Sequence, residues 1–191
     1  KLNKNISSSF SAEYMYTTGR YKFRYKKIDG YDTTAIRHNG DVKALRAEIG
    51  LFGLIPDGNW RTRIYAYNSE RGYPGAVVKN RFSNEDRQWD TNFFLQSSFR
   101  KKFNTFYSLL LNGKFAYDYL HYLSDQREAE SLNNIDNHYK QQEGYISAAN
   151  QFTIFPFWTT NISIDFLWNR LDADLIDFAY PRRFSTLAAF A

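Results

Sequence analysis

The sequence contains no cysteine among its 191 residues. Disulfide bonds, thiolate metal sites and a cysteine nucleophile are therefore excluded. The chain also has no run of 18 apolar residues, which excludes a helical membrane protein. The single Met lies at position 15, and no secretory signal follows Lys1. We therefore expect residues 1–191 to be one partial domain of a longer protein whose signal peptide is absent.

Catalytic and metal-binding motifs are also missing. The three histidines, His38, His121 and His138, have no metal-ligand spacing, so we predict no metal site. Glu143 and Asp165 could form an acid–base pair, but nothing in the sequence fixes their separation. No Ser/His/Asp hydrolase motif is present. We expect a protein that is not an enzyme and uses no cofactor.

What the sequence has in abundance is alternation of apolar and polar side chains. In the clearest stretch, Trp158 to Trp168, the even positions are bulky or neutral, while Asn161, Ser163 and Asp165 take odd positions. A period of two predicts a β-strand with one apolar and one polar face. The predicted strands cover residues 6–16, 42–55, 60–69, 89–100, 105–119, 139–155, 158–168 and 183–191.

The connections between these strands alternate in length. Short turns are predicted at residues 56–59, 101–104 and 155–157, and long connections at 17–41, 70–87, 120–138 and 170–182. All long connections then lie at one end of the strands, which is typical of outer-membrane barrels. The pattern predicts an all-β fold, a segment of about eight strands from a transmembrane antiparallel up-and-down β-barrel.

Aromatic residues make up 19% of the chain, and many bracket the apolar faces. Three pairs on single faces are ten residues apart: Trp89 and Phe99, Tyr107 and Tyr117, Trp158 and Trp168. At ~3.3 Å per residue and a tilt of about 45°, this spacing spans roughly 23 Å of height, close to the lipid-facing band of about 25 Å. We interpret these six residues as aromatic girdles.

The opposite strand faces carry charge. Ten charged residues would point inward in a closed barrel: Arg46, Glu48, Arg61, Arg63, Asp90, Arg100, Lys114, Asp118, Glu143 and Asp165. Such an interior must be wet or filled by polar protein. Two alternatives stay open, a complete small eight-stranded outer-membrane barrel with a structural or adhesive role, and a soluble ligand-binding β-barrel or sandwich.

Four segments resemble one family. They are residues 69–77 (Ser-Glu-Arg-Gly-Tyr-Pro-Gly-Ala-Val), 87–94 (Arg-Gln-Trp-Asp-Thr-Asn-Phe-Phe), 117–122 (Tyr-Asp-Tyr-Leu-His-Tyr) and 178–183 (Phe-Ala-Tyr-Pro-Arg-Arg). With the strand pattern they resemble the barrel of TonB-dependent outer-membrane receptors of the Bacteroidetes type. The resemblance implies a barrel of 22 strands, filled by an N-terminal plug domain and located in the bacterial outer membrane.

The same resemblance implies the function and the partners. A receptor of this family takes up a scarce nutrient with energy from TonB. The chain resembles cobalamin or siderophore receptors more than the larger glycan importers, and cobalamin is the favoured nutrient. The expected partners are outer-membrane lipid, the protein's own plug domain, TonB through the missing N-terminal part, and a surface lipoprotein. Neither plug nor TonB box is part of these 191 residues.

Two groups of residues are candidates for contacts. Arg71, Tyr73, His121 and Tyr122 lie at predicted outer strand ends or in outer loops, where a large polar substrate would bind. The alternative is that they only organise their own turn or are solvated. The second group is predicted to face the plug from the barrel interior: Arg61, Arg63, Tyr65 and Tyr67.

A basic run near the N-terminus interleaves cations with aromatic rings, from Arg20 to Lys27. Single-stranded nucleic acid binds such platforms. The run also fits a solvated two-faced hairpin arm, and Asp29, Asp32 and Asp41 balance its charge. We therefore expect no nucleic-acid partner.

Overall fold

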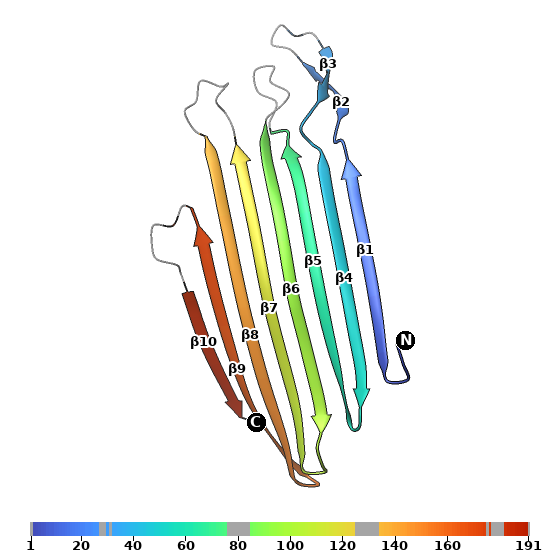
Figure 1. Cartoon of the computed structure of the whole chain (residues 1–191). Coiled ribbons are helices and arrows are strands. Elements are labelled where there is room, and N and C mark those ends of the chain that lie inside the picture. Colours follow the sequence, from blue (N-terminus) through green and yellow to red (C-terminus); the bar gives the residue numbers. More distant parts are fainter. Residues whose placement is uncertain are drawn as a thin grey trace.

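A computed structural model of the chain (Figure 1) describes residues 2–26, 30, 32–75, 85–124, 134–174, 176 and 182–190. Eight strands form one antiparallel sheet and two more form a hairpin. The sheet contains, in spatial order, β1 (Ile6–Thr17), β4 (Val42–Ile55), β5 (Gly58–Tyr73), β6 (Asp86–Lys102), β7 (Tyr107–Ser124), β8 (Ile135–Phe155), β9 (Trp158–Ala173) and β10 (Arg182–Phe190). The hairpin pairs β2 (Tyr21–Lys26) with β3 (Asp32–Arg37). No helix in these residues is long and apolar enough to cross a membrane.

The eight strands of the sheet are the eight that the alternation predicts, so the all-β, antiparallel part of the prediction is confirmed. The interval 17–41, predicted as a long connection, holds the β2–β3 hairpin, and β2 lies in the basic run that also fits a hairpin arm. Most sheet strands also extend further than predicted at the end with the long connections: β5 reaches Tyr73, β7 reaches Ser124 and β9 reaches Ala173. Polar side chains pair across the strands there, and a search for apolar alternation cannot detect such pairing.

The sheet is open. β1 and β10 form its two edges and do not pair with each other, so these eight strands do not close into a barrel by themselves. Among the described residues, no second sheet packs against either face to make a sandwich. Figure 1 shows a single layer, with the short turns at one end of the strands and the β2–β3 hairpin at the other. We call these the turn end and the loop end.

A single layer leaves the chain almost without a hydrophobic core. Among the described residues only three hydrophobic ones are buried, Ala44, Ala116 and Ala173. Large side chains such as Ile146 and Ile164 keep 64% and 54% of their surface exposed. A sheet is normally stable only when an apolar face packs on another layer. No part of the chain that the structure describes covers either face in this way.

The cross-strand register sorts the side chains onto two distinct faces. On one face, a row across the sheet reads Phe10, Ile49, Ile64, Leu95, Phe115, Gly144, Trp168 and Phe184. On the other face, a row reads Glu13, Arg46, Tyr67, Asn92, Asp118, Gln141 and Leu171. We call the first the apolar face and the second the charged face.

Charges on the apolar face lie only near the strand ends. On β6, for example, Arg87 and Lys101 bracket a stretch from Trp89 to Phe99 in which no side chain on this face is charged. The other described strands of the sheet show the same uncharged middle. At ~3.3 Å per residue and a tilt of about 45°, the stretch on β6 corresponds to roughly 23 Å of height.

Candidate functional site

The loop ends of β5, β6 and β7 bring polar side chains together on the charged face. Arg71 lies opposite Gln88, and Gln88 lies opposite Tyr122, so the three share one cross-strand row. Nη2 of Arg71 donates to Oδ2 of Asp90 at 3.0 Å and to Oγ of Ser69 at 3.3 Å. Arg71 and Asp90 therefore form an ion pair, with 34% and 14% of their side chains exposed.

The contacts continue from this ion pair to β7. Nε2 of Gln88 donates to the second oxygen of Asp90 at 2.7 Å, and the Tyr73 hydroxyl donates to Oε1 of Gln88 at 2.8 Å. The rings of Tyr73 and Tyr122 meet edge to face, with centroids 6.4 Å apart. The Tyr122 hydroxyl donates to Asp86 at 3.3 Å. One polar network thus joins three strands, and we call it the loop-end network.

The loop-end network presents a cation and two phenol rings that are held in place by their neighbours. Nε of Arg71 is buried and has no hydrogen-bond partner among the described residues. Ser124 is almost completely buried and donates to Asp86 at 2.7 Å, which fixes that carboxylate from behind. A fixed arrangement of this kind suits a large polar ligand, because little side-chain freedom remains to be lost on binding.

Three of the four predicted contact residues, Arg71, Tyr73 and Tyr122, belong to this network. His121 does not, because neighbours in a strand point to opposite faces and His121 therefore lies on the apolar face. There its ring stacks on Trp89, with centroids 4.7 Å apart. The sequence interpretation missed Asp86, Gln88 and Ser124 as network members. Gln88 and Asp86 precede the predicted start of their strand, so the strand boundary hid them.

The predicted plug-facing residues share one face, as their spacing requires. Arg61, Arg63, Tyr65 and Tyr67 occupy alternate positions of β5 on the charged face. Arg61 and Arg63 line a hollow of about 180 Å³ with Gln96 and Ser98. The Tyr65 ring stacks on Phe94 with centroids 4.9 Å apart. These side chains lie nearer the turn end than Arg71 and form a separate part of the charged face.

Elsewhere on the charged face, opposite charges pair across neighbouring strands. The ion pairs are Glu13 with Arg46 at 2.6 Å, Glu48 with Arg63 at 3.7 Å, and Lys114 with Glu143 at 2.8 Å. Glu143 is therefore engaged with Lys114. Asp165 lies opposite Ser147, four residues along β8 from Glu143, so the register does not bring the two carboxylates together.

The six predicted girdle residues all lie on the apolar face by register and alternation. Tyr107 stacks on Phe152 and on Phe103, with centroids 5.2 Å and 5.4 Å apart. Trp158 lies beside Phe155, at 6.3 Å between centroids. Aromatic rings thus gather at the turn end. Phe103, Phe152 and Phe155 belong to that group although the sequence analysis did not single them out.

The apolar face ends in charged contacts at the loop end. Nη2 of Arg87 donates to Asp41 at 2.9 Å and to Glu70 at 2.7 Å. Nη1 of Arg87 also reaches Oδ1 of Asn39, the residue whose positive φ of 56° turns the chain from β3 toward β4. The hydrogen bond from Arg87 holds the pKa of the Asp41 carboxyl below its usual value. This cluster ties the start of β4 to β5 and β6.

The chain was compared with models of known protein families and with curated proteins. No family model and no curated protein matches it.

Proposed function

We propose that this chain is part of the wall of a transmembrane β-barrel in the bacterial outer membrane. The observation that carries the proposal is the apolar face. Large apolar side chains cover it, and the middle of its described strands has no charged side chain on this face. Only a hydrocarbon-like environment favours such a surface on an eight-stranded sheet. The charged face then lies toward the barrel interior.

Several polar side chains of the apolar face support this assignment, because they pair with one another across neighbouring strands. The pairs are Thr62 with Ser97 at 2.9 Å, Asn68 with Thr91 at 2.9 Å, and Tyr107 with Asn150 at 2.8 Å. In lipid, an unpaired polar group costs several kcal/mol because no water can satisfy it. In water the same pairs would have little advantage.

We further propose that the whole protein is a TonB-dependent receptor for a scarce nutrient of the cobalamin or siderophore class. Two features favour this reading over a small complete barrel. The eight strands of the sheet leave two edges unpaired, as a segment of a larger barrel would. The charged face carries arginines and carboxylates that a polar plug domain would cover. The loop-end network is then the part of this chain that meets the nutrient.

The membrane assignment can be tested with single cysteines, since the chain has none of its own. In the full protein reconstituted in bilayers, spin labels would be placed at Ile164→Cys on the apolar face and at its neighbour Ser163→Cys on the charged face. We expect oxygen, which concentrates in lipid, to relax the label at 164 much more strongly than a water-soluble nickel complex does. Equal access of both relaxants at both positions would contradict the assignment.

The receptor assignment needs a separate test. A strain that lacks the gene should stop growing when cobalamin or siderophore-bound iron is limiting, and the full-length gene should restore growth only when TonB is present. The double variant Arg71→Ala/Tyr73→Ala should weaken nutrient binding by the purified receptor, whereas Arg63→Ala, near the turn end, should not. Unchanged affinity in the double variant would remove the loop-end network from the binding site.

A further inference from the structure

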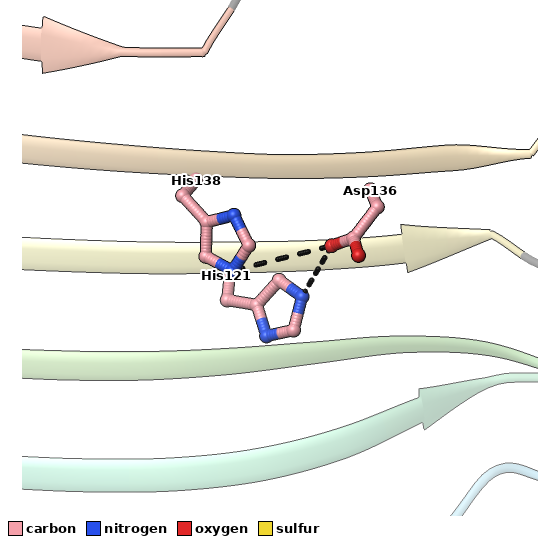
Figure 2. A group of neighbouring side chains, drawn as sticks. All are labelled: His121, Asp136 and His138. Carbon is pink, nitrogen blue, oxygen red and sulfur yellow. Dashed lines mark hydrogen bonds and ion pairs between the residues drawn. The ribbon is translucent and has the colours of Figure 1, made fainter.

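Two histidines that are 17 residues apart in the sequence lie face to face in the sheet. β7 and β8 pair so that His121 is directly opposite His138, and their ring centroids are 4.1 Å apart. Asp136, two residues before His138, lies on the same face of β8, and its Oδ1 is 2.7 Å from Nε2 of His121 and 4.0 Å from Nε2 of His138. Figure 2 shows the two rings side by side with the Asp136 carboxylate turned toward them.

The three side chains each offer a ligand atom, and these atoms lie within 4.8 Å of one another. In tetrahedral zinc sites, with Zn–N and Zn–O bonds of about 2.0–2.2 Å, neighbouring ligand atoms are roughly 3.4 Å apart. The two nitrogen-to-oxygen distances here bracket that value. An ion could therefore sit between the three side chains after small rotations of the rings and of the carboxylate.

A fourth side chain prepares His138 for this role. Nδ1 of His138 donates to Oδ2 of Asp174 at 2.8 Å, and the same oxygen accepts the backbone N–H of His138 at 2.8 Å. With its proton on Nδ1, the ring keeps a lone pair on Nε2, the nitrogen that faces Asp136. A carboxylate bound to the far nitrogen of a metal-ligating histidine is the usual support in such sites.

The neighbouring rings hold His121 in place as well. Its ring is stacked between Trp89 on β6 and His138 on β8, and 22% of the side chain is exposed. The cluster therefore remains open to solvent on one side, while the His121 ring has a stacked neighbour on each of its two faces. It lies beyond the uncharged middle of the apolar face, toward the loop end.

We propose that His121, Asp136 and His138 bind a divalent transition-metal ion of the zinc and copper class. Imidazole and carboxylate ligands suit these metals rather than Ca²⁺ or Mg²⁺. Three protein ligands leave the fourth position to water or to another ligand. The ion would displace the proton that joins His121 to Asp136 and would tie β7 to β8. The proposal requires only the pairing of these two strands and is independent of the proposed function.

The test uses the full protein without a histidine tag, in detergent micelles. Titration with Zn²⁺ followed by calorimetry should give one ion per chain at neutral pH, with binding that weakens in acid because protons compete with the ion for the ligand atoms. Cu²⁺ should quench tryptophan fluorescence, and Trp89→Phe should remove most of this quenching because the Trp89 ring contacts His121.

Matched variants decide whether this cluster is the site. His121→Ala and His138→Ala should each weaken Zn²⁺ binding at least tenfold, and Asp174→Asn should weaken it about 10- to 100-fold. His38→Ala, a histidine outside the cluster, should leave it unchanged. His138→Gln serves if the alanine variant misfolds, and circular dichroism checks the strand content. Unchanged affinity in folded His121 and His138 variants, or no Zn²⁺ binding in the wild type, would overturn the proposal.

Discussion

The apolar face and the charged face are made by the same eight strands, yet charged side chains are distributed differently on the two faces. On the apolar face, charged side chains lie only near the strand ends, as with Arg87 and Lys101 on β6. On the charged face they occur along the whole strand, and many have a partner of opposite sign on the next strand, as Lys114 has in Glu143. A sheet in water on both sides would have no reason for this difference.

The comparison indicates what each face needs as its environment. Exposed isoleucines at 146 and 164 need an apolar cover. Paired but half-exposed ions such as Arg46 and Glu13 tolerate water or polar protein. Alternate residues of each strand therefore suit two different environments, one apolar and one polar.

The largest effect is expected from putting a charge in the middle of the apolar face. Ile164→Arg should destabilise the protein in bilayers by about 2–4 kcal/mol, because an arginine at the lipid midplane loses its hydration. The measurement is a denaturant titration of the full protein in vesicles, followed by tryptophan fluorescence or by heat-modifiable migration in gels.

The matched control is the next residue along the same strand. Ser163→Arg adds the same charge on the charged face and should cost less than about 1 kcal/mol, since water or polar protein can solvate it there. Equal losses for the two variants would remove the distinction between the faces and with it the membrane assignment.

A smaller effect is expected from breaking the loop-end network on the charged face. Asp90→Ala removes the acceptor of Ser69, Arg71 and Gln88, and leaves a half-buried guanidinium without its ion pair. Such losses typically cost about 1–3 kcal/mol. The same denaturant titration measures the loss.

The control for Asp90→Ala is Glu48→Ala, whose partner Arg63 lies 3.7 Å away with 66% of its side chain exposed. An exposed pair of this kind contributes about 0–1 kcal/mol. If Glu48→Ala proved as costly as Asp90→Ala, the loop-end network would be no more than another surface ion pair.

The strands were predictable because a half-exposed strand alternates in sequence, whatever covers it. β4 begins and ends where the alternation predicts, at Val42 and Ile55. The loop ends were not predictable in this way. β5 continues beyond Ser69 because Arg71 and Tyr73 pair with polar residues of β6, and an alternation of polar with polar gives no hydrophobic signal.

The candidate site was only partly predictable for a related reason. Arg71 and Tyr73 are two residues apart on one strand, so the sequence alone places their side chains on the same face. That Tyr122 joins them and His121 does not depends on β7 continuing beyond residue 119, where the alternation predicts its end. The same holds for His121 and His138, whose spacing fits no motif but whose register makes them neighbours.

The smallest effect concerns the cluster that ends the apolar face at the loop end. Arg87 lowers the pKa of Asp41 from its ordinary value of 3.8, chiefly by a hydrogen bond to the carboxylate. A lowered folded-state pKa stabilises the fold above pH ~4, and this contribution is lost as the pH falls through the lower, folded-state pKa. Asp41→Asn should therefore speed hydrogen exchange of the Gly72 amide, which donates to the Asp41 carbonyl at 2.9 Å, by several-fold at most at pH 7.

The ratio of variant to wild-type exchange rates should shrink toward one in acid and in high salt, because the pair is partly exposed to water. A ratio that stays constant with pH and salt would mean that Asp41 acts through its shape alone, and that charge does not tie this edge of the apolar face to β6.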